Sequence, residues 1–181
     1  MRYILRHNNC KRTIKKIKIR YKKVFGRIEM GYQGSVLVVD DEIGPRESLR
    51  MILHPLYEVY TAADGEEALA CIQRQDIDLV TLDMNMPGVS GLEVLREMRK
   101  RKVEVDVIII SGYINSQSTQ EAKNYGAADV ISKPFNVTDI IASVGKLVER
   151  KKFQQEVKTL LQTAKDLGAI DDSQAEKILY N

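Results

Sequence analysis

The chain has 181 residues, of which 44% are hydrophobic and 29% are charged. This length suits one domain with appendages, and the composition supports a packed core and excludes global disorder. No apolar run approaches the roughly 18 residues that a membrane-spanning helix needs. The two cysteines lack the paired spacing of a disulfide framework or a zinc cluster. We therefore expect a cytoplasmic protein without a membrane partner.

The charge is distributed unevenly along the chain. Residues 1–33 carry 11 lysines and arginines against a single acidic residue, whereas the rest of the chain carries 17 bases and 24 acids. A basic arm suits contact with nucleic acid or an anionic surface, but a solvated, disordered leader also explains it. We favour the disordered arm, and we expect the working module to begin near Met30.

From residue 35 onward, predicted strands alternate with predicted helices. An uninterrupted, β-branched run over 35–39 predicts a strand that is covered on both faces, and Pro45 opens the helix that follows it. Further strands are predicted over 58–62, 79–82, 105–110 and 129–132, with helices from 64 and over 92–100, 117–125 and 137–148. Five such pairs predict an α/β fold with a doubly wound parallel sheet.

Polar side chains follow four of these strands. Asp40 and Asp41 come after the first strand, Asp83 after the third, Ser111 after the fourth and Lys133 after the fifth. A strand-end aspartate is often only a turn former or a helix cap, but five complementary groups at one edge of a parallel sheet favour a ligand site.

A shared ligand also constrains the topology. If Asp41 and Asp83 bind the same ligand, the first and third strands are neighbours. Right-handed crossovers then give the order 2-1-3-4-5, which is flavodoxin-like.

The types of residue at this edge indicate a chemistry. Clustered carboxylates repel each other unless a cation lies between them, and oxygen ligands with sparse protein ligation favour Mg²⁺. A carboxylate beside Mg²⁺, a hydroxyl and a lysine forms a set for phosphoryl transfer, in which the carboxylate attacks and becomes an acyl phosphate.

These residues resemble the receiver domain of response regulators, which are proteins of two-component signalling related to the chemotaxis regulator. The resemblance covers about residues 34–150 and includes four motifs. They are Asp40-Asp41-Glu42, Asp83-Met84-Asn85-Met86-Pro87-Gly88 with Gly91, Ser111-Gly112, and Lys133-Pro134-Phe135.

The resemblance implies a role for each residue of the site. Asp83 would be the phosphoacceptor, and Ser111 and Lys133 would contact the phosphoryl group. Asp40, Asp41 and Asp83 would bind Mg²⁺ together with the backbone carbonyl of Asn85. A cis peptide bond would precede Pro134.

The resemblance also implies a signalling protein rather than an enzyme. Phosphorylation by a sensor histidine kinase or a phosphotransfer protein would activate it, and it would then bind a downstream protein target. Receivers usually carry an aromatic residue three positions before the lysine, where this chain has Val130. The phosphorylation chemistry does not need that ring, but the usual signal route does. Tyr113 is either a substitute gate or an exposed loop residue.

Two other functions share parts of this pattern. A phosphatase of the haloacid dehalogenase type also uses an aspartate nucleophile, Mg²⁺, a hydroxyl and a lysine. It normally carries a second aspartate two residues after the nucleophile, where this chain has Asn85. A nucleic-acid-binding regulator would instead use the basic arm.

Residues 151–181 form a predicted helical tail, too short for an output domain with its own core. Together with the arm over 1–33 and the receiver over 34–150, it completes the predicted domain organisation. The tail shows an apolar stripe with alternating spacings of four and three, a helix stop and a capping box. These are Phe153, Val157, Leu160, Ala164 and Leu167, then Gly168, then Ser173-Gln174-Ala175-Glu176. The stripe either packs on the receiver or forms a homodimer or partner surface.

Overall fold

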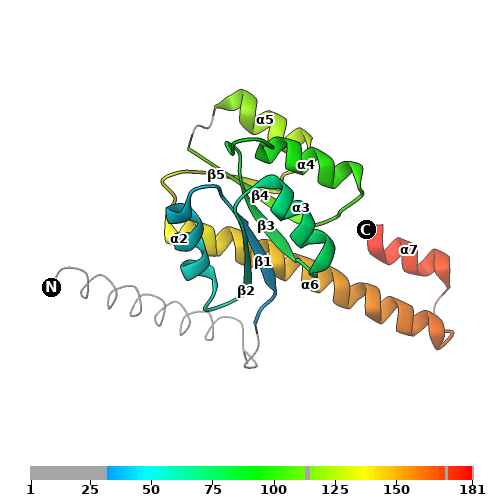
Figure 1. Ribbon diagram of the computed structural model, residues 1–181. Helices are drawn as coiled ribbons and strands as arrows, with labels where there is room; N and C mark the ends of the chain where they lie inside the picture. The colour runs from blue at the N-terminus through cyan, green and yellow to red at the C-terminus, as the bar shows by residue number, and fades with distance from the viewer. Residues whose placement is uncertain (1–31, 113–114, 170, 181) are drawn as a thin grey trace.

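A computed structural model describes residues 32–112, 115–169 and 171–180, and shows a parallel sheet with helices on both faces (Figure 1). The strands are β1 (Ser35–Val39), β2 (Glu58–Ala62), β3 (Leu79–Asp83), β4 (Asp106–Ser111) and β5 (Asp129–Ser132). The helices are α2 (Ile43–Leu53), α3 (Gly65–Arg74), α4 (Gly91–Lys100), α5 (Ser116–Asn124), α6 (Val137–Asp166) and α7 (Asp172–Tyr180). The strand order β2-β1-β3-β4-β5 confirms the predicted topology.

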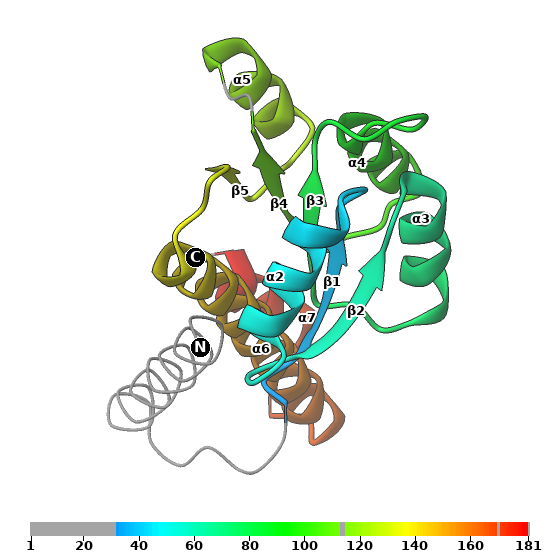
Figure 2. The ribbon, with the colours of Figure 1, turned by 60° about the vertical axis from the view of Figure 1, so that its left-hand side comes forward.

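The sheet separates two apolar cores, which explains the uninterrupted apolar runs of its central strands. Leu37 and Val80 belong to the core beneath α3 and α4, whereas Val36, Val38 and Leu79 belong to the core beneath α2 and α6. Figure 2 shows these two pairs of helices on opposite sides of the sheet. The strands are therefore fixed from both faces, and their carboxyl ends meet at one edge.

Side-chain caps begin most of the helices that follow these strands. Asp64 caps α3, Asn136 caps α6, and Ser90 caps α4 in a capping box. Helix α2 begins at Ile43, two residues before the predicted start at Pro45. The proline is tolerated there because the first N–H groups of a helix need no intrahelical partner.

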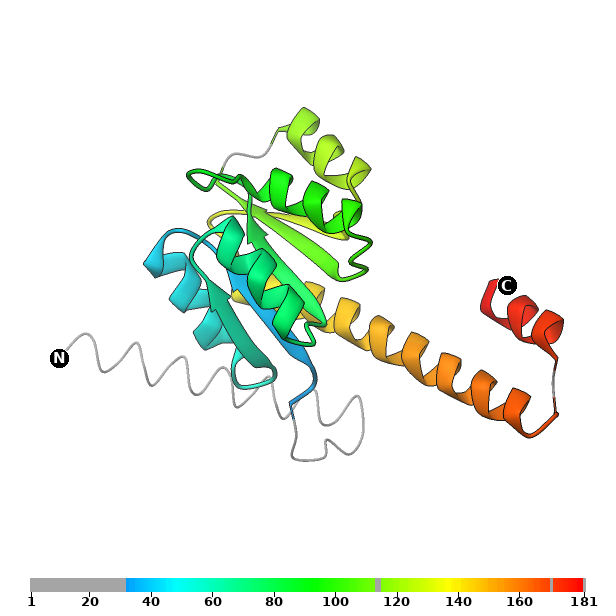
Figure 3. The ribbon, with the colours of Figure 1, turned by 45° about the vertical axis from the view of Figure 1, so that its right-hand side comes forward.

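The last receiver helix is longer than predicted. The sequence predicts a helix over 137–148 and a separate helical tail over 151–181, whereas α6 runs for 30 residues without a break. The predicted limit between residues 150 and 151 falls inside this helix. Figure 3 shows α6 extending past the sheet, with α7 beginning near its far end.

The end of α6 matches the predicted helix stop. Gly168 adopts a left-handed conformation with φ 69°, and the N–H of Ala169 donates to the carbonyl of Ala164 at 2.9 Å. The sequence predicts Ser173 as the capping residue of α7, and this prediction is wrong. Asp171 caps this helix instead, because its carboxylate accepts from the N–H of Gln174 at 2.8 Å and the Gln174 side chain accepts from the N–H of Asp171.

Several predictions concern residues outside the described ranges. They are the disordered arm, the start of the module near Met30 and the role of Tyr113, and they stay predictions, as do the domain limits. Among the described residues, no helix is long and apolar enough to cross a membrane.

Candidate functional site

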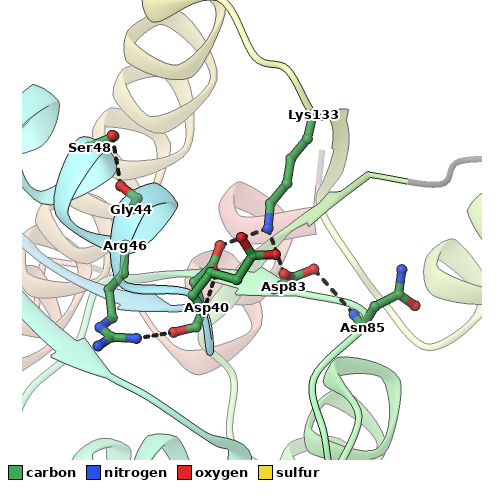
Figure 4. A network of polar contacts seen from close by, with 8 residues as sticks. Asp40, Gly44, Arg46, Ser48, Asp83, Asn85 and Lys133 are labelled. Atoms are coloured by element: carbon green, nitrogen blue, oxygen red, sulfur yellow. Dashed lines mark hydrogen bonds and ion pairs between the residues drawn. The ribbon is translucent and has the colours of Figure 1, made fainter.

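Three of the predicted site residues meet at the carboxyl edge of the sheet. The Lys133 ammonium donates to Asp40 Oδ2 at 2.8 Å and to Asp83 Oδ2 at 2.6 Å (Figure 4). Asp40 follows β1, Asp83 ends β3 and Lys133 follows β5, so separate parts of the chain supply the three groups. Both carboxylates are almost fully buried, with side-chain exposures of 1% and 5%.

Local backbone geometry orients the two buried carboxylates. Asp40 Oδ1 accepts from the N–H of Glu42 at 3.0 Å, and Asp83 Oδ1 accepts from the N–H of Asn85 at 3.2 Å. Each aspartate is therefore held by the backbone two residues further along, as is common where a strand gives way to a turn. The second oxygen of each carboxylate points to Lys133.

Gly91 allows α4 to begin against the end of β3. A Cβ atom at this position would lie 2.0 Å from the carbonyl oxygen of Asp83, which is far inside van der Waals contact. The Gly91 N–H donates to the carbonyl of Met84 at 3.1 Å. The backbone that carries Asp83 is therefore held in place by a close approach that only glycine permits.

Asp41 completes a cluster of carboxylates. One oxygen from each of Asp40, Asp41 and Asp83 lies within 4.8 Å of the other two. The single ammonium of Lys133 balances only part of this negative charge. Three carboxylate oxygens with unbalanced charge are the donor set that a hard cation such as Mg²⁺ prefers, so the residues present fit that ion.

The Lys133 side chain is held in its charged form. Burial of the ammonium lowers the pKa of Lys133, but the hydrogen bonds and charges of Asp40 and Asp83 raise it by a larger amount. The pKa of Lys133 therefore lies above its ordinary value. A cationic lysine between two carboxylates suits the binding of an incoming phosphoryl group.

Ser111 lies at the end of β4, next to the strand that carries Asp83. Asp83 pairs with Ile110 in the sheet, and the carbonyl of the fully buried Ser111 accepts from the N–H of Lys133 at 2.8 Å. The backbone of Ser111 is therefore adjacent to both residues. The peptide bond between Lys133 and Pro134 is cis.

The sequence analysis missed Arg46, whose guanidinium donates to the backbone carbonyl of Asp40 (Figure 4). Its position, six residues after Asp40 and in the first turns of α2, was the available signal. Val130, at the position where receivers usually carry an aromatic ring, is half-buried and packs against the core beneath α3 and α4. The predicted role of the Asn85 carbonyl in metal binding stays a prediction.

Residues 36–145 match the response regulator receiver domain. The chain belongs to this family. Its order of strands and its acidic cluster are those that the resemblance implies.

Relatives and solved structures agree with this assignment. The cell cycle response regulator CtrA of Brucella ovis is 34% identical over 118 residues, which are 65% of this chain and 51% of the relative. Chemotaxis protein CheY4 of Vibrio cholerae is similar with a TM-score of 0.60 and 32% identity, over 63% of this receiver chain and 98% of that one. NtrX of Brucella abortus is similar with a TM-score of 0.65 and 36% identity. The similarity covers 71% of this chain and 30% of the NtrX chain.

The chain spans about half the length of the curated relatives that it matches. These comparisons support a receiver, and none of them supports the phosphatase or the nucleic-acid-binding alternative.

Proposed function

We propose that this receiver is a phosphorylation-activated signalling protein of a two-component phosphorelay in the cytoplasm, with Asp83 as its phosphoacceptor. The observation that carries the proposal is the contact of Lys133 with two of three clustered carboxylates at the carboxyl edge of the sheet. In such a cluster the carboxylates can bind a cation, and the ammonium can bind the oxygens of a phosphoryl group. The protein accepts and later loses one phosphoryl group, and does not turn over an external substrate.

The contacts of Asp83 suggest how it reacts. Oδ2 is held by the Lys133 ammonium at 2.6 Å, whereas Oδ1 accepts a longer hydrogen bond of 3.2 Å from the N–H of Asn85. Oδ1 is therefore the less constrained oxygen. It attacks the phosphorus of a phosphohistidine, a P–O bond forms as the P–N bond breaks, and the leaving imidazole takes up a proton.

The other residues stabilise the product of this step. Asp40, Asp41 and Asp83 would hold Mg²⁺ together with the Asn85 carbonyl, and the bound ion would neutralise charge on the phosphoryl oxygens. We assign Lys133 as a donor to the same oxygens and the Ser111 hydroxyl as a further donor. Three groups thus act on the charge that the phosphoryl group brings.

Labelling with acetyl phosphate and Mg²⁺ tests the phosphoacceptor. The wild-type protein should gain the mass of one phosphoryl group, and Asp83→Asn should gain none, because the amide is nearly isosteric but is a poor nucleophile. Asp78→Asn, at the opposite edge of the sheet, is the matched control and should be labelled like the wild type. Equal labelling of Asp83→Asn would overturn the assignment.

We also propose where the phosphodonor approaches. Asp83 is buried, so a phosphohistidine must enter from the carboxyl edge of the sheet. Ile43, the first residue of α2, lies two residues after Asp41 and is 71% exposed. A large exposed apolar side chain beside the site suits an anchor for the histidine kinase or phosphotransfer protein.

Charge substitution separates docking from chemistry. Ile43→Asp should slow transfer from a histidine kinase that labels the wild type by about tenfold or more, with acetyl phosphate labelling unchanged. Met51→Asp, near the other end of α2 and 51% exposed, is the control and should transfer normally. Unimpaired transfer to Ile43→Asp, or an equal loss with acetyl phosphate, would contradict docking at this residue.

A further inference from the structure

The distal half of α6 and its C-cap residue, Leu167, expose three large apolar side chains in a row. Phe153, Leu160 and Leu167 are 67%, 68% and 79% exposed. They recur every seven residues, so they lie along one side of the helix with a drift of only about 20° per repeat. They do not pack on the receiver, which was one of the two predicted uses of the stripe. A regular row of this kind indicates a contact surface.

The receiver cannot fold back onto this row, because α6 is fixed where it leaves the sheet. Arg150 donates to both carboxylate oxygens of Asp106 at 2.8 and 2.9 Å. Lys151 contacts Asp78 at 2.9 Å and donates to the carbonyl of Ile77 at 3.1 Å. These contacts hold the helix to β3 and β4, and the segment beyond them projects away (Figure 3).

Helix α7 leaves the row uncovered. It packs beside α6 and is joined to it by an ion pair between Lys165 and Asp172 at 2.8 Å. On α7, Ala175 is fully buried, and on α6, Leu161 and Ala164 are half-buried. The two helices therefore bury one side of α6, while the row stays exposed on the adjacent side.

We propose that the row binds the same row of a second copy of this chain, with the two helices antiparallel and the two Leu160 side chains at the centre. Phe153 and Leu167 each lie seven residues from Leu160. An antiparallel pair therefore places Phe153 of one copy opposite Leu167 of the other, twice, and every large side chain in the row meets an apolar partner.

The charges beside the row favour this arrangement. Lys152, Glu156, Thr163 and Asp166 lie along one flank of the row. In the antiparallel pair, Lys152 of each copy lies within two residues of the level of Asp166 of the other, and Glu156 lies within one residue of the level of Thr163, so these four side chains bring no like charges together. Lys146 lies seven residues before Phe153 and is also exposed. A parallel pair would bring the Lys146 side chains of the two copies together, and their like charges would repel.

The oligomeric state tests the second copy as the occupant. Sedimentation equilibrium of the full chain should show a concentration-dependent dimer. Leu160→Asp should raise the dissociation constant by roughly tenfold or more. Met51→Asp adds the same charge at an exposed apolar residue of α2 and should dimerise normally. Circular dichroism checks that α6 remains helical. A monomeric wild type, or unchanged dimerisation of Leu160→Asp, would overturn the proposal.

Cysteine cross-linking tests the orientation in a chain whose Cys10 and Cys71 are replaced by serine. A mixture of the Phe153→Cys and Leu167→Cys proteins should form a mixed disulfide-linked dimer, and neither protein should cross-link efficiently alone. Efficient cross-linking of Phe153→Cys with itself would indicate a parallel pair and would contradict the proposal. Asp83→Asn should dimerise like the wild type, so a failure here is distinct from a failure of the phosphoacceptor assignment.

Discussion

The two edges of the sheet both hold a lysine in contact with aspartate, but they differ in how far the charges are balanced. At the carboxyl edge, Lys133 contacts two carboxylates of a cluster of three. At the amino edge, Lys151 pairs with Asp78, which also accepts from the backbone N–H of Ser35 at 2.9 Å. The excess of negative charge suits the first edge to a cation, whereas at the second edge one lysine balances one carboxylate.

The amino edge also shows what a balanced site does to a carboxyl group. Burial raises the pKa of Asp78, but the hydrogen bonds from Ser35 and the hydrogen bond and charge of Lys151 lower it by a larger amount. The pKa of Asp78 therefore lies below its ordinary value. The ionised carboxylate of Asp78 is therefore more stable in the folded protein than in the unfolded chain. Its contacts thus stabilise the fold at neutral pH.

The largest expected effect comes from disturbing the backbone beneath the carboxyl edge. Gly91→Ala places a Cβ against the Asp83 carbonyl and should lower the free energy of unfolding by about 3 kcal/mol, as overpacked positions do. It should also slow labelling by acetyl phosphate. Urea denaturation measures the first effect. Gly44→Ala, where no atom lies within 4 Å of the added Cβ, is the control, and its change should stay within about 1 kcal/mol. Similar values for the two variants would contradict the role of Gly91.

Asp78→Asn tests whether the amino edge is purely structural. The amide keeps an acceptor for Ser35 but loses its charge beside Lys151, so the free energy of unfolding should fall by about 2 kcal/mol. Labelling of Asp83 by acetyl phosphate should not change. Slower labelling of Asp78→Asn, under conditions in which the variant is fully folded, would show that the two edges are coupled. The two edges could then not be assigned separate roles.

The pH dependence of the same variant sharpens this point. Because the pKa of Asp78 is lower in the folded protein, its contribution is fully present above the unfolded pKa of about 3.9 and is lost as the pH falls through the folded value. The difference in unfolding free energy between wild type and Asp78→Asn should thus be constant near neutral pH and shrink below about pH 4. A difference that grows on acidification would have the wrong sign.

The smallest effect is expected at Thr81, in the middle of β3. Its Oγ1 atom is buried and has no hydrogen-bond partner among the described residues. Thr81→Val keeps the shape and removes the unsatisfied hydroxyl, so it should raise the free energy of unfolding by about 1 kcal/mol. The half-buried Thr61 on β2 is the control, and its valine variant should gain less. A loss of stability at position 81 would show that the hydroxyl is satisfied.

Much of the receiver could be predicted from the sequence because its signals are local. The run over 35–39 gave the first strand without error, and the strand ends placed Asp40, Asp83 and Lys133 together. The fourth strand was predicted one residue too early, since Asp106–Ser111 has apolar residues on both sides of its true start. Buried runs of this kind fix the existence of a strand better than its ends.

Long-range contacts explain what the sequence analysis missed. The continuous α6 is held by Arg150 with Asp106 and by Lys151 with Asp78, and these partners lie 44 or more residues away along the chain. No local pattern indicates such pairs. The cap of α7 was misplaced because three successive residues, Asp171, Asp172 and Ser173, are all good capping residues, and only the structure distinguishes them.

The central claim is that Asp83 alone, among the clustered carboxylates, forms an acyl phosphate with the help of Mg²⁺. The most direct measurement is to treat the wild-type protein with acetyl phosphate, reduce the product with borohydride and locate the reduced residue by peptide mass spectrometry. Reduction should convert the phosphorylated aspartate at position 83 to homoserine, only in samples that contained Mg²⁺. Homoserine at position 40 or 41, or equal labelling when Mg²⁺ is removed by a chelator, would contradict it.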